Sequence, residues 1–150
     1  MCLNIHNMHH INSYLSSHPT GLVSIAPILV WKVLWKANFI SGLAPYRETM
    51  WIFNKCATVP RLRISRDHDV TEGLHAFISP FTAKHEAKSW YGNAHTVHPA
   101  IIPVGSNLLF GKDHDVVSTS LIVFKNIAAV RAKYGSITEA MKYTELTKAA

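Results

Sequence analysis

Runs of β-branched and aromatic residues dominate the middle of the chain, and such runs are typical of strands. The two longest cover residues 28–36 (ILVWKVLWK), directly after Pro27, and residues 116–124 (VVSTSLIVF). In the first run, Lys32 and Lys36 share a face with Leu34 between them, so that face should be only partly exposed to solvent. Shorter strands are expected at residues 49–53, 73–78, 95–103 and 108–110.

Residues 59–65 alternate between apolar and polar positions. Arg61 and Arg63 would point outward while Leu62 and Ile64 point inward, which predicts a half-buried strand. The two arginines would then share one face. They would serve either as a solvated surface or as the contact for an anionic partner such as a nucleotide.

Two stretches carry helix signals. Ser79 can cap a helix and Pro80 suits its first position, which predicts a helix over about 81–91. A capping box, S-x-x-E, opens at Ser136 and predicts a second helix over about 136–148. This second helix has a weakly apolar face, so it would pack loosely or cover a sheet edge.

Strands outnumber helices and no strand–helix–strand rhythm recurs, so we expect an α+β protein. Its mostly antiparallel, bent sheet would accompany the two helices, and residues 41–46 (SGLAPY) would form a loop. Residues 1–20 are rich in His, Asn and Ser without a clear period, which predicts a flexible N-terminal arm. Residues 21–150 would form a single domain, because a chain of this length suits one core.

Composition and charge exclude several classes. The chain of 150 residues is 48% hydrophobic and 16% charged, which argues against disorder and against a coiled coil. The net charge of +6 is spread evenly along the chain, which argues against a nucleic-acid partner. Lysines interrupt the most apolar stretch, residues 21–44, so we expect no membrane partner. The start lacks a secretory signal pattern, which favours the cytoplasm.

Three groups of residues could carry chemistry. The sequence Asp-His-Asp-Val occurs twice after a basic residue, at residues 66–70 and 112–116, and suits either polar turns or a metal or catalytic cluster. His95 and His98 are three residues apart, but an extended chain would put them on opposite faces, so no metal site is predicted. Cys2 would become the N-terminal residue after removal of Met1, and its α-amine could then act as the base for its own thiol. Alternatively, Cys2 has no catalytic role.

Six short motifs occur in an order that resembles a group of small uncharacterised proteins common in phages and prophages. They are Met1-Cys2-Leu3, VWKVL at 30–34, SGLAPY at 41–46, GLHAF at 73–77, IIPVGS at 101–106 and DVVS at 115–118. The resemblance spans roughly residues 1–125 and implies a small accessory protein, located in the host cytoplasm if phage-encoded. It implies no established activity.

A weaker likeness relates the order of strands and helix to ADP-ribosyltransferase-like folds. In that fold a residue on an early strand holds a dinucleotide, and a late acid assists transfer. The likeness implies a site with His75 at its centre, together with Lys32, Tyr46 and Asp115. The residues themselves predict no cofactor. The likeness to ADP-ribosyltransferase-like folds implies a nucleotide such as NAD.

Three functions therefore stay open, and whether the protein is an enzyme stays open with them. The first is an accessory protein that binds a host protein or a small anionic, nucleotide-like ligand through five candidate ligand-binding residues: Lys32, Tyr46, Arg61, Arg63 and Ser118. The second is a nucleotide-dependent enzyme that uses His75 and Asp115. The third is a hydrolase or transferase that depends on Cys2. The oligomeric state is not predictable from the residues.

Overall fold

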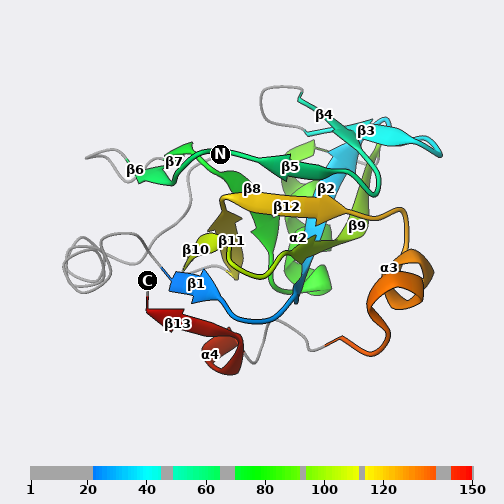
Figure 1. The fold of residues 1–150 in the computed structure, drawn as a ribbon. Coiled ribbons are helices and arrows are strands. Elements are labelled where there is room, and N and C mark those ends of the chain that lie inside the picture. The colour runs from blue at the N-terminus through cyan, green and yellow to red at the C-terminus, as the bar shows by residue number, and fades with distance from the viewer. Residues whose placement is uncertain are drawn as a thin grey trace.

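A strongly curled antiparallel sheet forms the centre of the protein (Figure 1). The computed structural model describes residues 22–44, 49–64, 70–91, 94–111, 114–137 and 143–149. The strands of this sheet are β1 (Leu22–Ser24), β2 (Ile28–Trp35), β3 (Ser41–Leu43), β4 (Met50–Ile52), β5 (Cys56–Thr58), β8 (Leu74–Phe77), β9 (His95–Ile102), β10 (Asn107–Phe110), β11 (Asp115–Ser118), β12 (Ser120–Val123) and β13 (Thr147–Ala149). They follow the order β13-β1-β10-β11-β8-β2-β9-β12-β5, with β3 on β2 and β4 on β3. The α+β class with a bent antiparallel sheet is therefore confirmed.

The long central pair consists of β2 and β9, which stay in register over eight residues from Ile28↔Ile102 to Trp35↔His95. Both were expected from their sequences, and β4, β8 and β10 confirm the shorter predicted strands. The concave face of the sheet carries the largest apolar cluster, to which β2 contributes Val30 and Leu34 with no exposed surface. The core therefore lies inside the curl of the sheet.

Helices cover the opposite face of β2 and its neighbours. The helix α2 (Pro80–Glu86) continues into a π-helical turn (Ala87–Tyr91), which confirms the helix expected over 81–91. Ser79 occupies its N-cap position, although its side chain makes no capping bond. Val33 packs there against Ala83 of α2. No helix within the described ranges is long and apolar enough to cross a membrane.

The expectation of one strand over 116–124 is wrong at its centre. The chain divides there into β11 and β12, which pair with different neighbours. The hydroxyl of Ser118 donates to the Ser120 carbonyl at 2.7 Å and accepts from the Ser120 amide at 3.1 Å. Hydroxyl side chains that bond to nearby backbone in this way compete with the strand ladder. The Ser-Thr-Ser sequence therefore turns the chain from one part of the sheet to another.

The C-terminal prediction is wrong in two respects. The main helix of this region is α3 (Ile127–Tyr134), which Asn126 caps by accepting from the Ala129 amide at 3.0 Å. In the region expected to be helical, α4 (Tyr143–Leu146) is only four residues long, and the last strand, β13, pairs with β1. The sheet edge is thus extended by a strand. Residues 138–142 lie outside the described residues.

Two further expectations need correction. Residues 41–46 were expected as a loop, but β3 pairs there with both β2 and β4. Gly42 allows this close packing, since a Cβ at this position would lie 2.9 Å from Leu34 Cδ1. The half-buried strand expected at 59–65 shrinks to β6 (Arg63–Ile64), which pairs with β7 (Val70–Glu72) in a separate small sheet. The N-terminal arm, residues 1–20, lies outside the described residues.

Candidate functional site

A seam in the curled sheet opens between β2 and β8. These strands are neighbours, but they pair at a single position, Trp31↔Phe77. On its other side β8 stays paired with β11 over four residues, so it follows β11 and diverges from β2. A strand pair that separates leaves backbone groups and space between the two strands. This seam is where the structure forms its candidate site.

A cavity of about 310 Å³ lies at the seam. This volume is near the lower end of the range for small-molecule sites. Its lining combines a majority of apolar side chains with five polar ones, and comprises Lys32, Val33, Ala44, Thr49, Trp51, Val59, Val70, Thr71, Glu72, Gly73, Leu74, His75 and Phe77. A mostly apolar cavity with a few polar groups is the common form of a ligand site.

One wall of the cavity belongs to the flap, which we define as residues 39–44 and 49–53 and which contains β3 and β4. In β4, burial alternates: Trp51 is buried, whereas Met50 and Ile52 are exposed. Trp51 lines the cavity. Because successive side chains of a strand point to opposite faces, the flap presents an aromatic ring inward and apolar side chains outward.

Lys32 enters the cavity from β2. It lies on the concave face of the strand, between Val30 and Leu34, and only 8% of its surface is exposed. Its Nζ donates a hydrogen bond of 2.6 Å to the backbone oxygen of His75. The same ammonium lies 4.9 Å from the ring centroid of Trp51. Lys32 thus spans the seam between β2 and β8, where backbone pairing has ended.

The electrostatic state of Lys32 is unusual for a lysine. Burial lowers its pKa from 10.5 to about 8, because the charged ammonium loses its hydration. Among the described residues, Lys32 forms no ion pair with a carboxylate, and burial alone accounts for its lowered pKa. An ammonium has three donors, and the His75 oxygen uses one of them. The cavity therefore presents an ammonium that is not ion-paired among the described residues, since Glu72 in the cavity wall is engaged by Arg61 and Arg63.

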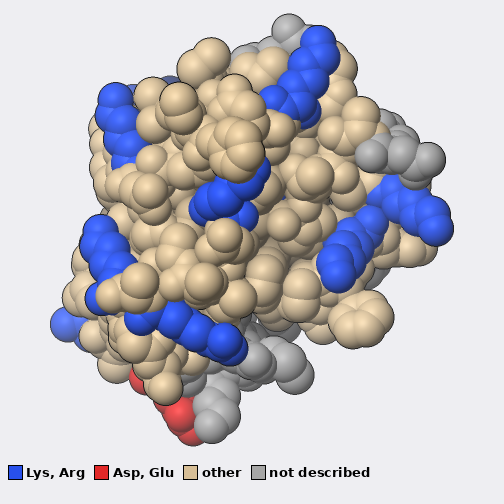
Figure 2. Space-filling model, turned by 90° about the vertical axis from the view of Figure 1, so that its right-hand side faces the viewer, with Lys and Arg blue, Asp and Glu red and all other residues tan. Residues whose placement is uncertain are grey.

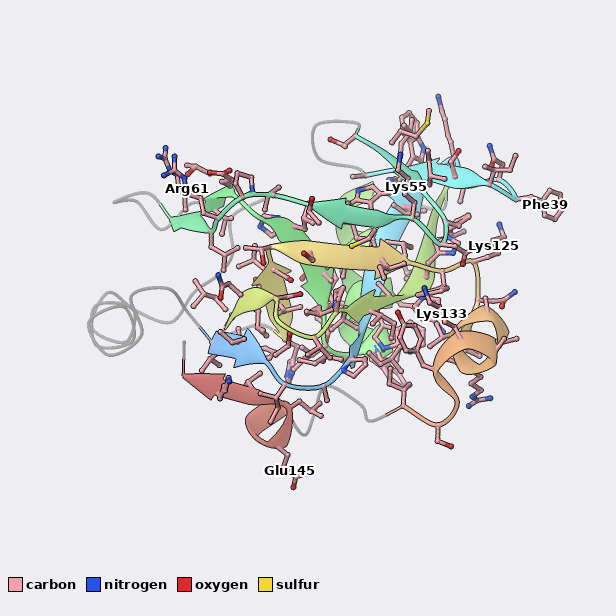
Figure 3. The ribbon with its side chains drawn as sticks, viewed as in Figure 1. Phe39, Lys55, Arg61, Lys125, Lys133 and Glu145 are labelled. Atoms are coloured by element: carbon pink, nitrogen blue, oxygen red, sulfur yellow. The ribbon has the colours of Figure 1, made fainter. Side chains whose placement is uncertain are left out.

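The two arginines predicted as ligand contacts lie beside the cavity rather than in it. Arg61 Nε lies 3.4 Å from Glu72 Oε2, and Arg63 Nε lies 3.8 Å from the same oxygen. Glu72 lines the cavity, whereas the arginine side chains are more than half exposed. Figure 3 shows Arg61 on the outer surface. Glu72 is thus shared between the arginines and the cavity wall.

The structure brings His75 and Lys32 together but places Asp115 elsewhere. His75 is half-buried and lines the cavity. Asp115 is buried in β11 opposite Phe77, is absent from the lining, and has its carboxylate against the backbone of Gly111. A Cβ on Gly111 would overlap that carboxylate, so the glycine makes room for it. Asp115 is therefore not part of the cavity wall, and a joint role of His75 and Asp115 stays a prediction.

The remaining predicted residues do not reach the cavity or lie outside the described residues. Ser118 is buried and uses its hydroxyl on the backbone of Ser120, which is a structural role. Tyr46 and Cys2 lie outside the described residues. Trp51 and Glu72 were not anticipated from the sequence. Trp51 could be recognised only from the alternation of the short strand M-W-I, which requires knowing that the flap covers a cavity.

The histidine pair on β9 has structural contacts. His98 is buried, with Nδ1 2.9 Å from the Lys125 carbonyl oxygen and Nε2 2.7 Å from Thr96 Oγ1. Burial lowers its pKa. His95 stacks on Trp35, with the ring centroids 6.2 Å apart. Across the described ranges, no three His, Cys, Asp or Glu side chains gather closely enough to hold a metal ion.

Comparison with known proteins adds no family. No protein-family model, no curated protein and no solved structure matches this chain significantly. The functional argument therefore depends on the geometry of the cavity alone.

Proposed function

We propose that this protein binds a small, mostly apolar ligand that carries one anionic group, in the cavity at the seam between β2 and β8. The observation that supports this most strongly is the buried ammonium of Lys32, which faces the cavity and has no carboxylate partner among the described residues. A buried charge is costly unless it is paired. An anionic group on a ligand would supply the missing partner.

The other walls define the rest of the ligand. Trp51 and Phe77 offer aromatic surfaces, and the aliphatic part of the lining comprises Val33, Ala44, Val59, Val70 and Leu74. A flat ring system can pack against such surfaces. The cavity of about 310 Å³ suits an aromatic acid or a mononucleotide-sized molecule better than a dinucleotide. The cavity therefore restricts the class of small anionic, nucleotide-like ligands that the sequence suggests to molecules of about this size.

Titration calorimetry with a panel of aromatic carboxylates and nucleoside monophosphates tests the proposal. A ligand that binds the wild type should lose most of its affinity for Lys32→Met, since the variant keeps the apolar length of the side chain and removes its charge. Lys36→Met is the matched control, because Lys36 is an exposed lysine just after the same strand. Equal losses in both variants, or no loss in Lys32→Met, would reject Lys32 as the anion contact.

The pH dependence gives an independent readout. Lys32 loses its charge as the pH rises through about 8, so affinity for an anion should fall above that pH. The Lys36→Met variant should keep this profile, whereas any residual binding to Lys32→Met should lack it. A wild-type affinity that stays constant through this range would contradict the proposed ion pair.

A second candidate is transfer from a nucleotide at His75. His75 and Lys32 line the same cavity, which supports this candidate, and because the cavity is small for a dinucleotide, part of NAD would lie outside it. Incubation with NAD should then release nicotinamide, and His75→Ala should abolish the release. The role as an accessory protein with a host partner stays a proposal of its own, as does the Cys2-dependent reaction. Activity that Cys2→Ala removes while the fold is retained would favour the last of these.

A further inference from the structure

The outer surface of the flap is unusually apolar. Four large hydrophobic side chains on this element are exposed: Phe39 by 91%, Ile40 by 70%, Met50 by 63% and Ile52 by 41%. Single exposed apolar residues are ordinary on protein surfaces. Four on one small two-stranded element form a cluster, and such clusters mark sites of interaction.

The tip of the flap is held in a defined shape. The Asn38 side-chain oxygen accepts hydrogen bonds from the amides of Ile40 at 2.7 Å and Ser41 at 2.8 Å. The Asn38 backbone amide donates to the Ser41 carbonyl at 2.8 Å, and Lys125 Nζ donates to the Asn38 carbonyl at 2.6 Å. Phe39 is therefore presented to solvent by an ordered turn. Because the backbone of this turn is already ordered, binding of Phe39 to another surface would cost little additional conformational entropy.

Two lysines lie near this apolar cluster. Lys125 Nζ lies 5.6 Å from the ring centroid of Phe39, and the amide of Lys55 donates to the Ile52 carbonyl at 3.3 Å. Figure 3 shows Phe39 projecting from the end of the flap with Lys125 beside it and Lys55 above β5. On the face that the flap tip shares with α3, Lys and Arg side chains are spread widely, and Asp and Glu appear only at the lower edge (Figure 2). The cluster thus lies in a positive field.

We propose that the flap docks on an anionic membrane surface. Phe39 and Ile40 would enter the boundary between headgroups and acyl chains, while Lys55 and Lys125 contact anionic headgroups. A combination of apolar insertion and basic residues is what stable binding to a lipid surface requires. The sequence led us to expect no membrane partner because lysines interrupt the most apolar stretch, but that argument concerns a membrane-spanning segment, and surface docking needs none.

The composition of the cluster favours lipid over two other occupants. Single-stranded nucleic acid binds by stacking its bases on aromatic rings, but Ile40, Met50 and Ile52 are not aromatic. A second copy of this chain would bring the same lysines face to face, in a protein whose net charge is already +6. Anionic lipid satisfies both the aliphatic side chains and the positive charge. The proposal uses the outer side of the flap and does not depend on a ligand in the cavity.

Co-sedimentation of the full chain with vesicles tests the docking. The protein should bind phosphatidylcholine vesicles that contain one-third phosphatidylglycerol, should bind pure phosphatidylcholine vesicles more weakly, and should lose affinity as salt is raised. The double variant Phe39→Ser, Ile40→Ser should lower the partition coefficient about tenfold or more, since it removes two exposed apolar side chains from the contact.

Phe81→Ser is the matched control, because Phe81 is an 85% exposed phenylalanine on α2, outside the flap. It should leave vesicle binding unchanged, and thermal unfolding should show that both variants stay folded. Absence of binding to the anionic vesicles, or equal losses in the flap variant and the control, would overturn the proposal. So would self-association, or binding of a single-stranded oligonucleotide, that the flap variant abolishes while vesicle binding persists.

Discussion

Replacing the buried lysine of the cavity should make the protein more stable at neutral pH. Lys32 has a pKa of about 8 in the folded protein, against 10.5 when hydrated. Each pKa unit corresponds to about 1.4 kcal/mol, so holding the charged form in the folded state costs about 3 kcal/mol. Lys32→Met removes this cost, and it also removes the hydrogen bond to the His75 oxygen and the contact with Trp51. These two contacts contribute about 1–2 kcal/mol, which leaves a net gain of about 1–2 kcal/mol.

The gain should depend on pH in a defined direction. Between about pH 8 and pH 10.5 the unfolded chain binds a proton at Lys32 that the folded protein does not. The contribution of Lys32 to stability therefore rises with pH through this window, and its cost is fully present below pH 8. The advantage of Lys32→Met should accordingly be largest at about pH 7 and should disappear at about pH 10.

Chemical denaturation at both pH values, with thermal melts beside it, measures this difference. At neutral pH the midpoint temperature of Lys32→Met should rise by about 2–8 °C for a domain of this size. Lys36→Met should change stability by less than about 0.5 kcal/mol, because Lys36 is exposed. If Lys32→Met were less stable than the wild type, or if its gain were the same at both pH values, the buried ammonium would not carry the cost that we assign to it.

Three other variants test the local structure. Gly73→Ala should lower the free energy of unfolding by about 2 kcal/mol or more, because Gly73 has φ +155° and a Cβ there would overlap Cγ2 of Val117; chemical denaturation checks this. Asn126→Ala should cost about 1 kcal/mol in the same assay, because the Ala129 amide loses its capping acceptor. The pKa of His98 is lowered chiefly by burial, so the protein should lose stability as the pH falls below about 6.5. A His98→Gln variant should lack that part of the slope, and equal slopes would contradict the assignment.

Much of the sheet could be predicted from the sequence because its strands are long apolar runs. In the central pair, β2 (ILVWKVLW) is such a run, whereas β9 (HTVHPAII) has four β-branched residues among its eight and ends in two isoleucines. The failures occur where few residues decide the conformation. The break between β11 and β12 depends on a hydroxyl that bonds to backbone, and β3 depends on a glycine that permits close packing with Leu34. Neither effect has a signature in apolar periodicity.

The candidate site was predictable only in part, for a related reason. Lys32 and His75 could be proposed from their strands, but their meeting depends on β8 following β11 away from β2, which is a property of the sheet. Asp115 was a candidate catalytic acid because of its position just before a predicted strand, but its carboxylate lies against Gly111. Trp51 enters the site through the flap. Which residues meet across the seam depends on the order in which the strands pair, and that order cannot be read from the local patterns of a single sequence.

The same property of Lys32 explains both its cost and its use. A strand of apolar residues would be more stable with methionine or leucine at this position, so the local rule for a buried strand is broken at Lys32. Departures of this kind are expected where a protein gives up stability for function. An anionic ligand group beside Nζ would neutralise the charge and raise the pKa of Lys32 again. The free energy that the buried charge of Lys32 costs is therefore also what gives the site its preference for an anion. Stability and anion binding should consequently change in opposite directions when Lys32 is replaced.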